Sequence, residues 1–173
     1  KIRKEVSWKE LKDQVAALAN FLKKQGIEKG DRVAAYMPNM PETVIMMLAT
    51  SSIGAIFSSA SPDFGVDGVL DRFGQIEPKI LLTTDGYWYN GKEINITNKV
   101  KDVVKVLPSL QKIVLAPLLG IKVNYNNDKF INYNDIQNKY TTNEMSFASL
   151  DLSDPLYIMF SSGTTGKPKC IVH

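Results

Sequence analysis

The sequence predicts an α/β fold in which helices and strands alternate in layers around a mainly parallel sheet. Some segments repeat apolar residues at spacings of three and four, and others carry short unbroken apolar runs. The strand-like runs are separated by helix-length segments, which suits the crossovers that parallel strands need. No internal repeat or second domain is visible, so we expect residues 1–173 to form a single partial domain.

The first two helices carry clear start signals. Ser7 and Glu10 have the spacing of a capping box, and an apolar stripe then runs to Leu22, with Gly26 placed to end the helix. Pro41 suits the first turn of a second helix, where its missing N–H costs nothing. That second helix is apolar on most faces, so we expect it to be buried.

The remaining elements follow from shorter patterns. Strands are expected at residues 32–37, 56–59, 79–84, 112–116 and 156–160, and amphipathic helices around residues 66–73 and 100–107. The stretch from residue 124 to residue 138 is rich in asparagine, and Asn124, Asn126, Asn127, Asn132 and Asn134 indicate a surface loop or irregular insert.

Composition excludes several classes of partner. The net charge of +3 and the scattered basic residues do not favour nucleic acid. The longest apolar run, residues 44–49, is far below the roughly 20 residues that a membrane span requires. A single cysteine, Cys170, cannot form an internal disulfide, and with no visible secretory signal we expect a cytoplasmic protein. The chain starts at Lys1 rather than methionine and stops at His173 inside a strand-like run, so we expect a piece of a longer protein.

The stretch best suited to chemistry lies between two strand-like runs near the end of the chain. It consists of Ser161, Ser162, Gly163, Thr164, Thr165, Gly166, Lys167, Pro168 and Lys169. Glycines allow close backbone approach, hydroxyls and N–H groups donate to phosphate oxygens, and lysines offset phosphate charge. The glycine spacing and the strand that follows differ from a Walker A loop. On composition alone, a flexible linker explains the stretch equally well.

The order of these residues resembles the phosphate-binding motif of the adenylate-forming superfamily of acyl-CoA synthetases. The resemblance implies that Thr164 and Thr165 bind phosphate oxygens and that Lys169 lies near the β- or γ-phosphate of ATP. It further implies that Lys167 contributes charge. The residues implied to shape the loop are Ser161, Ser162, Gly163 and Gly166.

Further blocks resemble the acetoacetyl-CoA synthetase family in particular. They are residues 61–66, 69–79, 89–92 and 159–170. The resemblance implies a ligase that joins acetoacetate to coenzyme A through an acyl-adenylate, with ATP consumed and Mg²⁺ required. Alternatives are a synthetase for acetate or propionate, or a non-catalytic nucleotide-binding module. No catalytic residue, metal ligand, adenine site or acid pocket is identified within this chain, so we expect it to be inactive by itself.

A second set of candidates comes from the same resemblance. Tyr89 and Lys92 align with arginines that lie near the coenzyme A nucleotide in acetyl-CoA synthetases. Lysine lacks the planar guanidinium fork, so phosphate recognition should differ here. The other candidates for coenzyme A contact are Phe57, Ser58 and Ser59. A strand end and an exposed turn without any ligand explain these positions equally well. Cys170 is expected to pack against its neighbours rather than to react.

Overall fold

The computed structural model describes residues 5–123, 128–142, 144–161 and 166–173. Within them, a seven-stranded sheet has the strand order β7-β6-β3-β1-β2-β8-β9, and every neighbouring pair is parallel except β8 with β9. The predicted α/β fold with a mainly parallel sheet is confirmed. The strands of this sheet are β1 (Arg32–Tyr36), β2 (Ile56–Ala60), β3 (Ile80–Thr83), β6 (Lys112–Leu115), β7 (Phe130–Asn132), β8 (Tyr157–Ser161) and β9 (Lys169–Val172).

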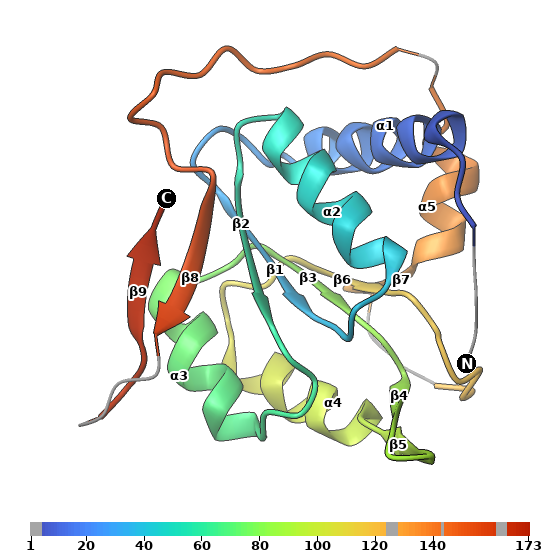
Figure 1. The fold of residues 1–173 in the computed structure, drawn as a ribbon, viewed down its shortest axis with the longest axis vertical. Coiled ribbons are helices and arrows are strands. Elements are labelled where there is room, and N and C mark those ends of the chain that lie inside the picture. The colour runs from blue at the N-terminus through green and yellow to red at the C-terminus, as the bar shows by residue number, and fades with distance from the viewer. Residues whose placement is uncertain (1–4, 124–127, 143, 162–165) are drawn as a thin grey trace.

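Helices cover both faces of the sheet, which gives three layers (Figure 1). In β1, Val33 and Ala35 belong to one core cluster, while Ala34 and Tyr36 belong to the other. This follows from the alternation of side chains along a strand. The first cluster contains α1 (Trp8–Lys24), α2 (Pro41–Ser52) and α5 (Tyr133–Lys139), and the second contains α3 (Val66–Ile76) and α4 (Thr97–Val106).

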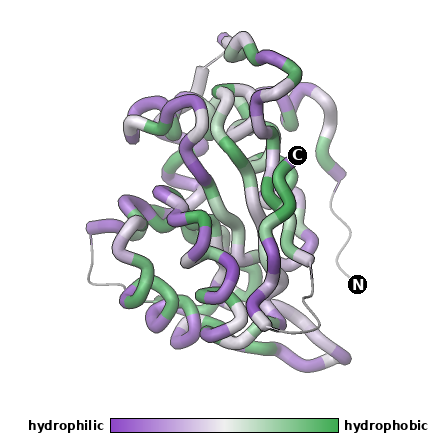
Figure 2. Tube along the Cα trace, turned by 90° about the vertical axis from the view of Figure 1, so that its left-hand side faces the viewer, coloured by the Kyte–Doolittle hydropathy of each residue, from purple (hydrophilic) through white to green (hydrophobic). Residues whose placement is uncertain are grey.

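Buried strands and half-buried helices explain the hydropathy pattern of the chain. Figure 2 shows hydrophobic or near-neutral residues along the central strands and mixed character along the helices. Strands covered on both faces read as unbroken apolar runs, as the fully buried residues 80–82 of β3 do. No helix among the described residues is long and apolar enough to cross a membrane.

Both helix starts predicted from the sequence are confirmed, but the burial predicted for α2 is wrong. The Glu10 N–H donates to Ser7 Oγ at 3.2 Å, and the Ser7 N–H donates to Glu10 Oε2 at 2.7 Å. Pro41 occupies the first turn of α2. Three apolar residues of α2 remain exposed, because α2 covers the sheet with one face only: Val44 (48%), Met47 (36%) and Leu48 (37%).

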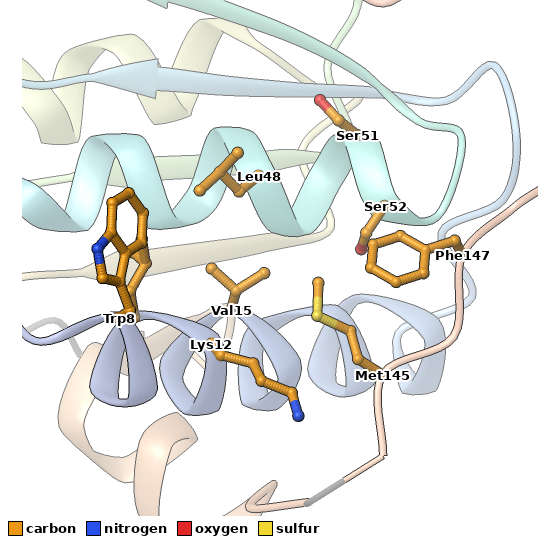
Figure 3. Close-up of a pocket in the computed structure, with 9 residues that line it drawn as sticks. Trp8, Lys12, Val15, Leu48, Ser51, Ser52, Met145 and Phe147 are labelled. Carbon is orange, nitrogen blue, oxygen red and sulfur yellow. The ribbon is translucent and has the colours of Figure 1, made fainter.

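An apolar groove of about 370 Å³ lies between α1 and α2 (Figure 3). Trp8 and Val15 of α1, Leu48 of α2, and Met145 and Phe147 of the segment before β8 line it. The groove belongs to the helical layer opposite the one that contains α3.

The prediction of an irregular asparagine-rich insert is wrong where the structure describes it, while residues 124–127 lie outside the described residues. Phe130–Asn132 forms the parallel edge strand β7, and α5 follows with Tyr133 and Ile136 buried. Asn132 caps α5, because its side chain accepts a hydrogen bond from the Asn134 N–H at 2.8 Å. Asparagine therefore starts a helix here instead of filling a loop.

Candidate functional site

The candidate site lies along the carboxyl edge of the sheet. β1, β2 and β8 are parallel, so the segments that follow them emerge at the same edge. The chain leaves β1 toward α2 on one face and leaves β2 toward α3 on the other. Such a change of face marks the place where open α/β sheets bind ligands.

The glycine-rich stretch is closed at its base by two antiparallel strands. Ser161 at the end of β8 pairs with Lys169 at the start of β9, and Phe160 pairs with Cys170. Gly166 has a φ of 151°, a conformation that favours glycine. Ser162, Gly163, Thr164 and Thr165 lie outside the described residues. The described ends of the stretch lie at the carboxyl edge of the sheet, where β8 lies between β2 and β9.

The two lysines of the loop differ in their surroundings. Lys167 Nζ lies 3.7 Å from Asp71 Oδ1 of α3, and the two side chains are 76% and 40% exposed. Lys169 is exposed at the start of β9, and no ion pair to it is found within the described parts of the chain. An exposed pair such as Lys167–Asp71 contributes little stability. Both ammonium groups are therefore accessible to an anion.

A second feature of this edge is a cavity of about 390 Å³ beside the ends of β1 and β2. It is lined by residues 37–39 after β1, by Thr43, by residues 59–63 and by residues 87–89. The last group belongs to a hairpin outside the main sheet, β4 (Gly86–Tyr89) and β5 (Lys92–Asn95). Trp88 and Tyr89 on this hairpin are 43% and 63% exposed. The cavity thus has aromatic and polar walls.

Two buried tyrosines fix the wall made by the segment after β2. Tyr87 O–H donates to Asp63 Oδ1 at 2.6 Å, and Tyr36 O–H donates to the Phe64 carbonyl oxygen at 2.6 Å. Burial, with the neighbouring carboxylate adding to it, raises the pKa of Tyr36 and of Tyr87 to about 12. Both phenols therefore remain donors at neutral pH, and the wall is held before any ligand arrives.

A buried carboxylate holds the base of the hairpin. Asp85 is fully buried and accepts backbone N–H groups from Leu118 at 2.7 Å, Leu119 at 3.0 Å and Ile121 at 2.8 Å. Burial alone would raise the pKa of Asp85, but these donors and the Thr84 hydroxyl lower it below the usual range. A charged Asp85 thereby ties the hairpin to the loop that follows β6.

Comparison with known proteins identifies the family. Residues 2–173 match the family model described as AMP-binding enzyme. The chain belongs to the AMP-binding enzyme family. It is 49% identical over 181 residues to the acetoacetyl-coenzyme A synthetase of Rhizobium meliloti (strain 1021), an alignment that covers 100% of this chain and 27% of that protein.

Other homologues carry the same name. Identity to the acetoacetyl-CoA synthetase of Rattus norvegicus is 47% over 174 residues, covering 97% of this chain and 26% of that protein. The solved structure of acetoacetyl-CoA synthetase from Streptomyces lividans matches with a TM-score of 0.91 and 40% identity, covering 98% of this chain and 25% of that one. The chain thus spans about a quarter of the length of the curated relatives it matches.

The structure separates the candidates for coenzyme A contact into three groups. Phe57 is 5% exposed within the core, and Ser58 is 1% exposed with its Oγ donating to the Ile158 carbonyl oxygen at 2.8 Å. Their burial leaves neither side chain able to contact a ligand in the cavity. Ser59 and Tyr89 line the cavity. Lys92 does not line it but pairs with Tyr89 across the hairpin.

Cys170 was expected to pack against its neighbours, and this expectation is wrong because β9 is exposed. The thiol is free and exposed, and Sγ donates to Gln75 Oε1 at 3.6 Å. Within the described residues, no group of three histidine, cysteine, aspartate or glutamate side chains could hold a metal ion.

Sequence reasoning missed several cavity residues, among them Asp63, Tyr87 and Trp88. The signal that could have placed two of them is the dipeptide Asn90-Gly91. These residues have φ values of 49° and 77°, as a tight hairpin turn requires. Recognising that turn would have predicted the hairpin. The hairpin would in turn have predicted that its aromatic residues lie at the carboxyl edge.

Proposed function

We propose that this chain is part of the N-terminal domain of a cytoplasmic ATP-dependent acetoacetate–CoA ligase. The observation that carries the proposal is 49% identity along the whole chain to a protein of that name. The glycine-rich stretch at the carboxyl edge of the sheet supports it, because this edge is where α/β folds bind nucleotides. The substrates would be acetoacetate, ATP and coenzyme A, with Mg²⁺ accompanying ATP.

The first half-reaction is adenylation. A carboxylate oxygen of acetoacetate attacks the α-phosphorus of ATP, the bond from that phosphorus to the bridging oxygen breaks, and pyrophosphate leaves. Negative charge grows on the leaving pyrophosphate. The hydroxyls of Thr164 and Thr165 and the ammonium of Lys169 would bind its oxygens, and Lys167 would add a second positive charge. Their effect is electrostatic.

The second half-reaction forms the thioester. The sulfur of coenzyme A attacks the acyl carbonyl carbon, its S–H proton passes to solvent, and AMP leaves as the bond from carbon to phosphate oxygen breaks. We place part of coenzyme A in the cavity beside Ser59 and Tyr89, with Lys92 next to it on the hairpin. The Trp88 and Tyr89 rings offer a stacking surface for a flat base.

The test is the specificity of the full-length protein. We expect kcat/KM for acetoacetate to exceed that for acetate by at least about a hundredfold. A site that hydrogen-bonds the 3-keto oxygen leaves its own polar group unpaired when acetate binds. A ratio near one, or higher activity with acetate or propionate, would refute the acetoacetate assignment but not the adenylate-forming one.

The isolated chain provides a second test. Mixed with ATP, coenzyme A and acetoacetate, residues 1–173 should release no pyrophosphate above background, because we identify no acid pocket or catalytic lysine among the described residues. The full-length protein in the same assay should release pyrophosphate in an acid-dependent manner. Nucleotide binding by the full-length protein without any acid-dependent exchange would instead indicate a non-catalytic module.

A further inference from the structure

The exit of the phosphate loop is attached to α3 through one glutamine. Gln75 Nε2 donates to the Pro168 carbonyl oxygen at 2.9 Å, and Gln75 Oε1 accepts from Cys170 Sγ at 3.6 Å. Pro168 and Cys170 are the two neighbours of Lys169. One amide group therefore contacts the backbone before Lys169 and the side chain after it.

A second contact comes from the same face of α3. Asp71 lies one helical turn before Gln75, and residues four apart share a helix face. The Asp71 carboxylate lies 3.7 Å from Lys167 Nζ, and the Asp71 carbonyl oxygen accepts a hydrogen bond from Gln75 Nε2. Asp71 and Gln75 thus hold residues 167, 168 and 170 from one side.

The helix that carries these contacts is firmly packed. Val69 and Phe73 of α3 are fully buried, and Ile76 is 6% exposed, all within the core cluster beneath the sheet. β9, in contrast, is exposed along its length and has β8 as its sheet neighbour. The direction in which β9 leaves β8 is therefore set by its pairing with β8 and by Gln75.

We propose that Gln75 is a positioning residue for Lys169, holding the exit of the loop so that the Lys169 ammonium meets the phosphates of the bound nucleotide. This inference rests on the proposed function. Electrostatic catalysis depends on charges that are already in place when the reaction starts, so a small shift of Lys169 lowers the rate. In this role Gln75 acts on Lys169 indirectly, through its contacts with the Pro168 carbonyl oxygen and the Cys170 thiol.

The test uses the full-length enzyme with Gln75→Met, which keeps the length of the side chain and removes both hydrogen bonds. Gln75→Ala is a second variant, and Gln111→Met is the matched control at another exposed glutamine. Adenylation is measured by ATP–pyrophosphate exchange, with whichever acid supports exchange in the unaltered enzyme. Thioester formation is measured from preformed acyl-adenylate. Alkylation of Cys170 by iodoacetamide, followed by peptide mass spectrometry, reports the contact with Gln75 without reference to activity.

Gln75→Met is expected to lower kcat/KM for ATP about threefold to tenfold, which is the range for losing one or two exposed hydrogen bonds. Thioester formation should be unchanged, Cys170 should be alkylated about two to five times faster, and Gln111→Met should match the unaltered enzyme. Unchanged exchange alongside faster alkylation would overturn the positioning role, as would equal slowing of both half-reactions. Unchanged alkylation would overturn the contact itself.

Failure of the proposed function would look different, since it appears in the unaltered enzyme. If exchange requires another acid, the acetoacetate assignment fails while Gln75 is tested with that acid. If no acid supports exchange, the ligase function and the role of Gln75 are both refuted.

Discussion

The loop exit and the cavity lie on the same edge of the sheet but are built in opposite ways. The loop exit carries two exposed lysines and is attached by Asp71 and Gln75 at the protein surface. Among the described residues that line the cavity, none is a lysine or arginine, and hydrogen bonds from the buried residues Tyr36 and Tyr87 fix its walls. The loop exit therefore offers positive charge, whereas the cavity offers walls of fixed shape.

The contrast predicts that the two regions would bind different parts of the proposed substrates. Under the proposed function, the phosphate groups of the substrates would need cations, and the two loop lysines would provide them. The cavity contains the Asp63 carboxylate and two partly exposed aromatic rings, which suit an uncharged, flat group with donors better than a phosphate. Mutations in the two regions should therefore affect different substrates and different half-reactions.

The largest effect is expected from Lys169→Ala in the full-length enzyme. Removing a charge that offsets the leaving pyrophosphate should slow adenylation about a hundredfold. Thioester formation from preformed acyl-adenylate should hardly change, because pyrophosphate has left before that step. Single-turnover measurements of each half-reaction check this, with Lys24→Ala at the exposed end of α1 as a control lysine. Equal slowing of both steps would remove Lys169 from the phosphate site.

The next effect concerns the support of the hairpin. Asp85→Ala leaves three partly buried N–H groups without their acceptor, and we expect it to lower the free energy of unfolding by about 2–4 kcal/mol. Urea unfolding of the full-length protein measures it. Residual activity should show a raised KM for coenzyme A with adenylation nearly unchanged, because the hairpin forms the cavity wall. If Asp85→Ala lowered only the rate of adenylation, the assignment of the hairpin to coenzyme A binding would be contradicted.

The same aspartate gives a pH test. The folded-state pKa of Asp85 lies below its unfolded value of about 3.9, so its stabilising effect is complete above that value. The effect disappears as the pH falls through the lower, folded-state pKa. The stability difference between the unaltered protein and Asp85→Asn should therefore be constant from pH 7 to about pH 5 and shrink below pH 4. A difference that grows on acidification would contradict the direction of the pKa shift.

A smaller and more selective effect is expected at the cavity. Tyr87→Phe removes the hydrogen bond to Asp63 and should raise KM for coenzyme A about tenfold, while ATP–pyrophosphate exchange stays within about twofold. Tyr133→Phe is a matched control. Its hydroxyl also donates to a side chain, Gln14 Oε1 at 3.1 Å, but on the opposite helical layer. If both variants raise KM for coenzyme A equally, the effect is on stability and not on the cavity.

Local sequence signals predicted the layered fold because most of its elements are specified by their own residues. The capping box at Ser7 and Glu10 and the proline at the start of α2 each act within one turn of helix. The insert was misjudged because asparagine serves both loops and helix caps, and only pairing of residues 130–132 with β6 decides between them. That pairing is a tertiary contact, which a single sequence does not display.

The candidate site divides in the same way. The glycine-rich stretch could be proposed from the sequence because the residues of its motif are consecutive, and its role stays a prediction. The cavity could not be proposed in this way, since its walls come from the ends of β1 and β2 and from a hairpin. Phe57 and Ser58 were predicted to contact coenzyme A because they align with residues that line that site in related synthetases. In the structure, the alternation of side chains along β2 points Phe57 into the core. Ser58 instead forms a hydrogen bond that joins β2 to β8. Only Ser59, at the next position, is exposed.

The smallest effect is expected from Lys167→Ala, and it sharpens the contrast within the loop itself. Lys167 faces Asp71, so part of its charge is already compensated, whereas Lys169 has no ion pair in the described chain. Both Lys167 and Asp71 are exposed, and an exposed pair is worth at most about 1 kcal/mol. We therefore expect Lys167→Ala to raise KM for ATP less than about threefold.

Asp71→Asn should lower KM for ATP by a similar factor, because it frees the Lys167 ammonium for phosphate. Raising the salt concentration should shrink both differences, since exposed charges are screened. A hundredfold loss in Lys167→Ala would place both lysines on the phosphates equally and would remove the distinction drawn between them.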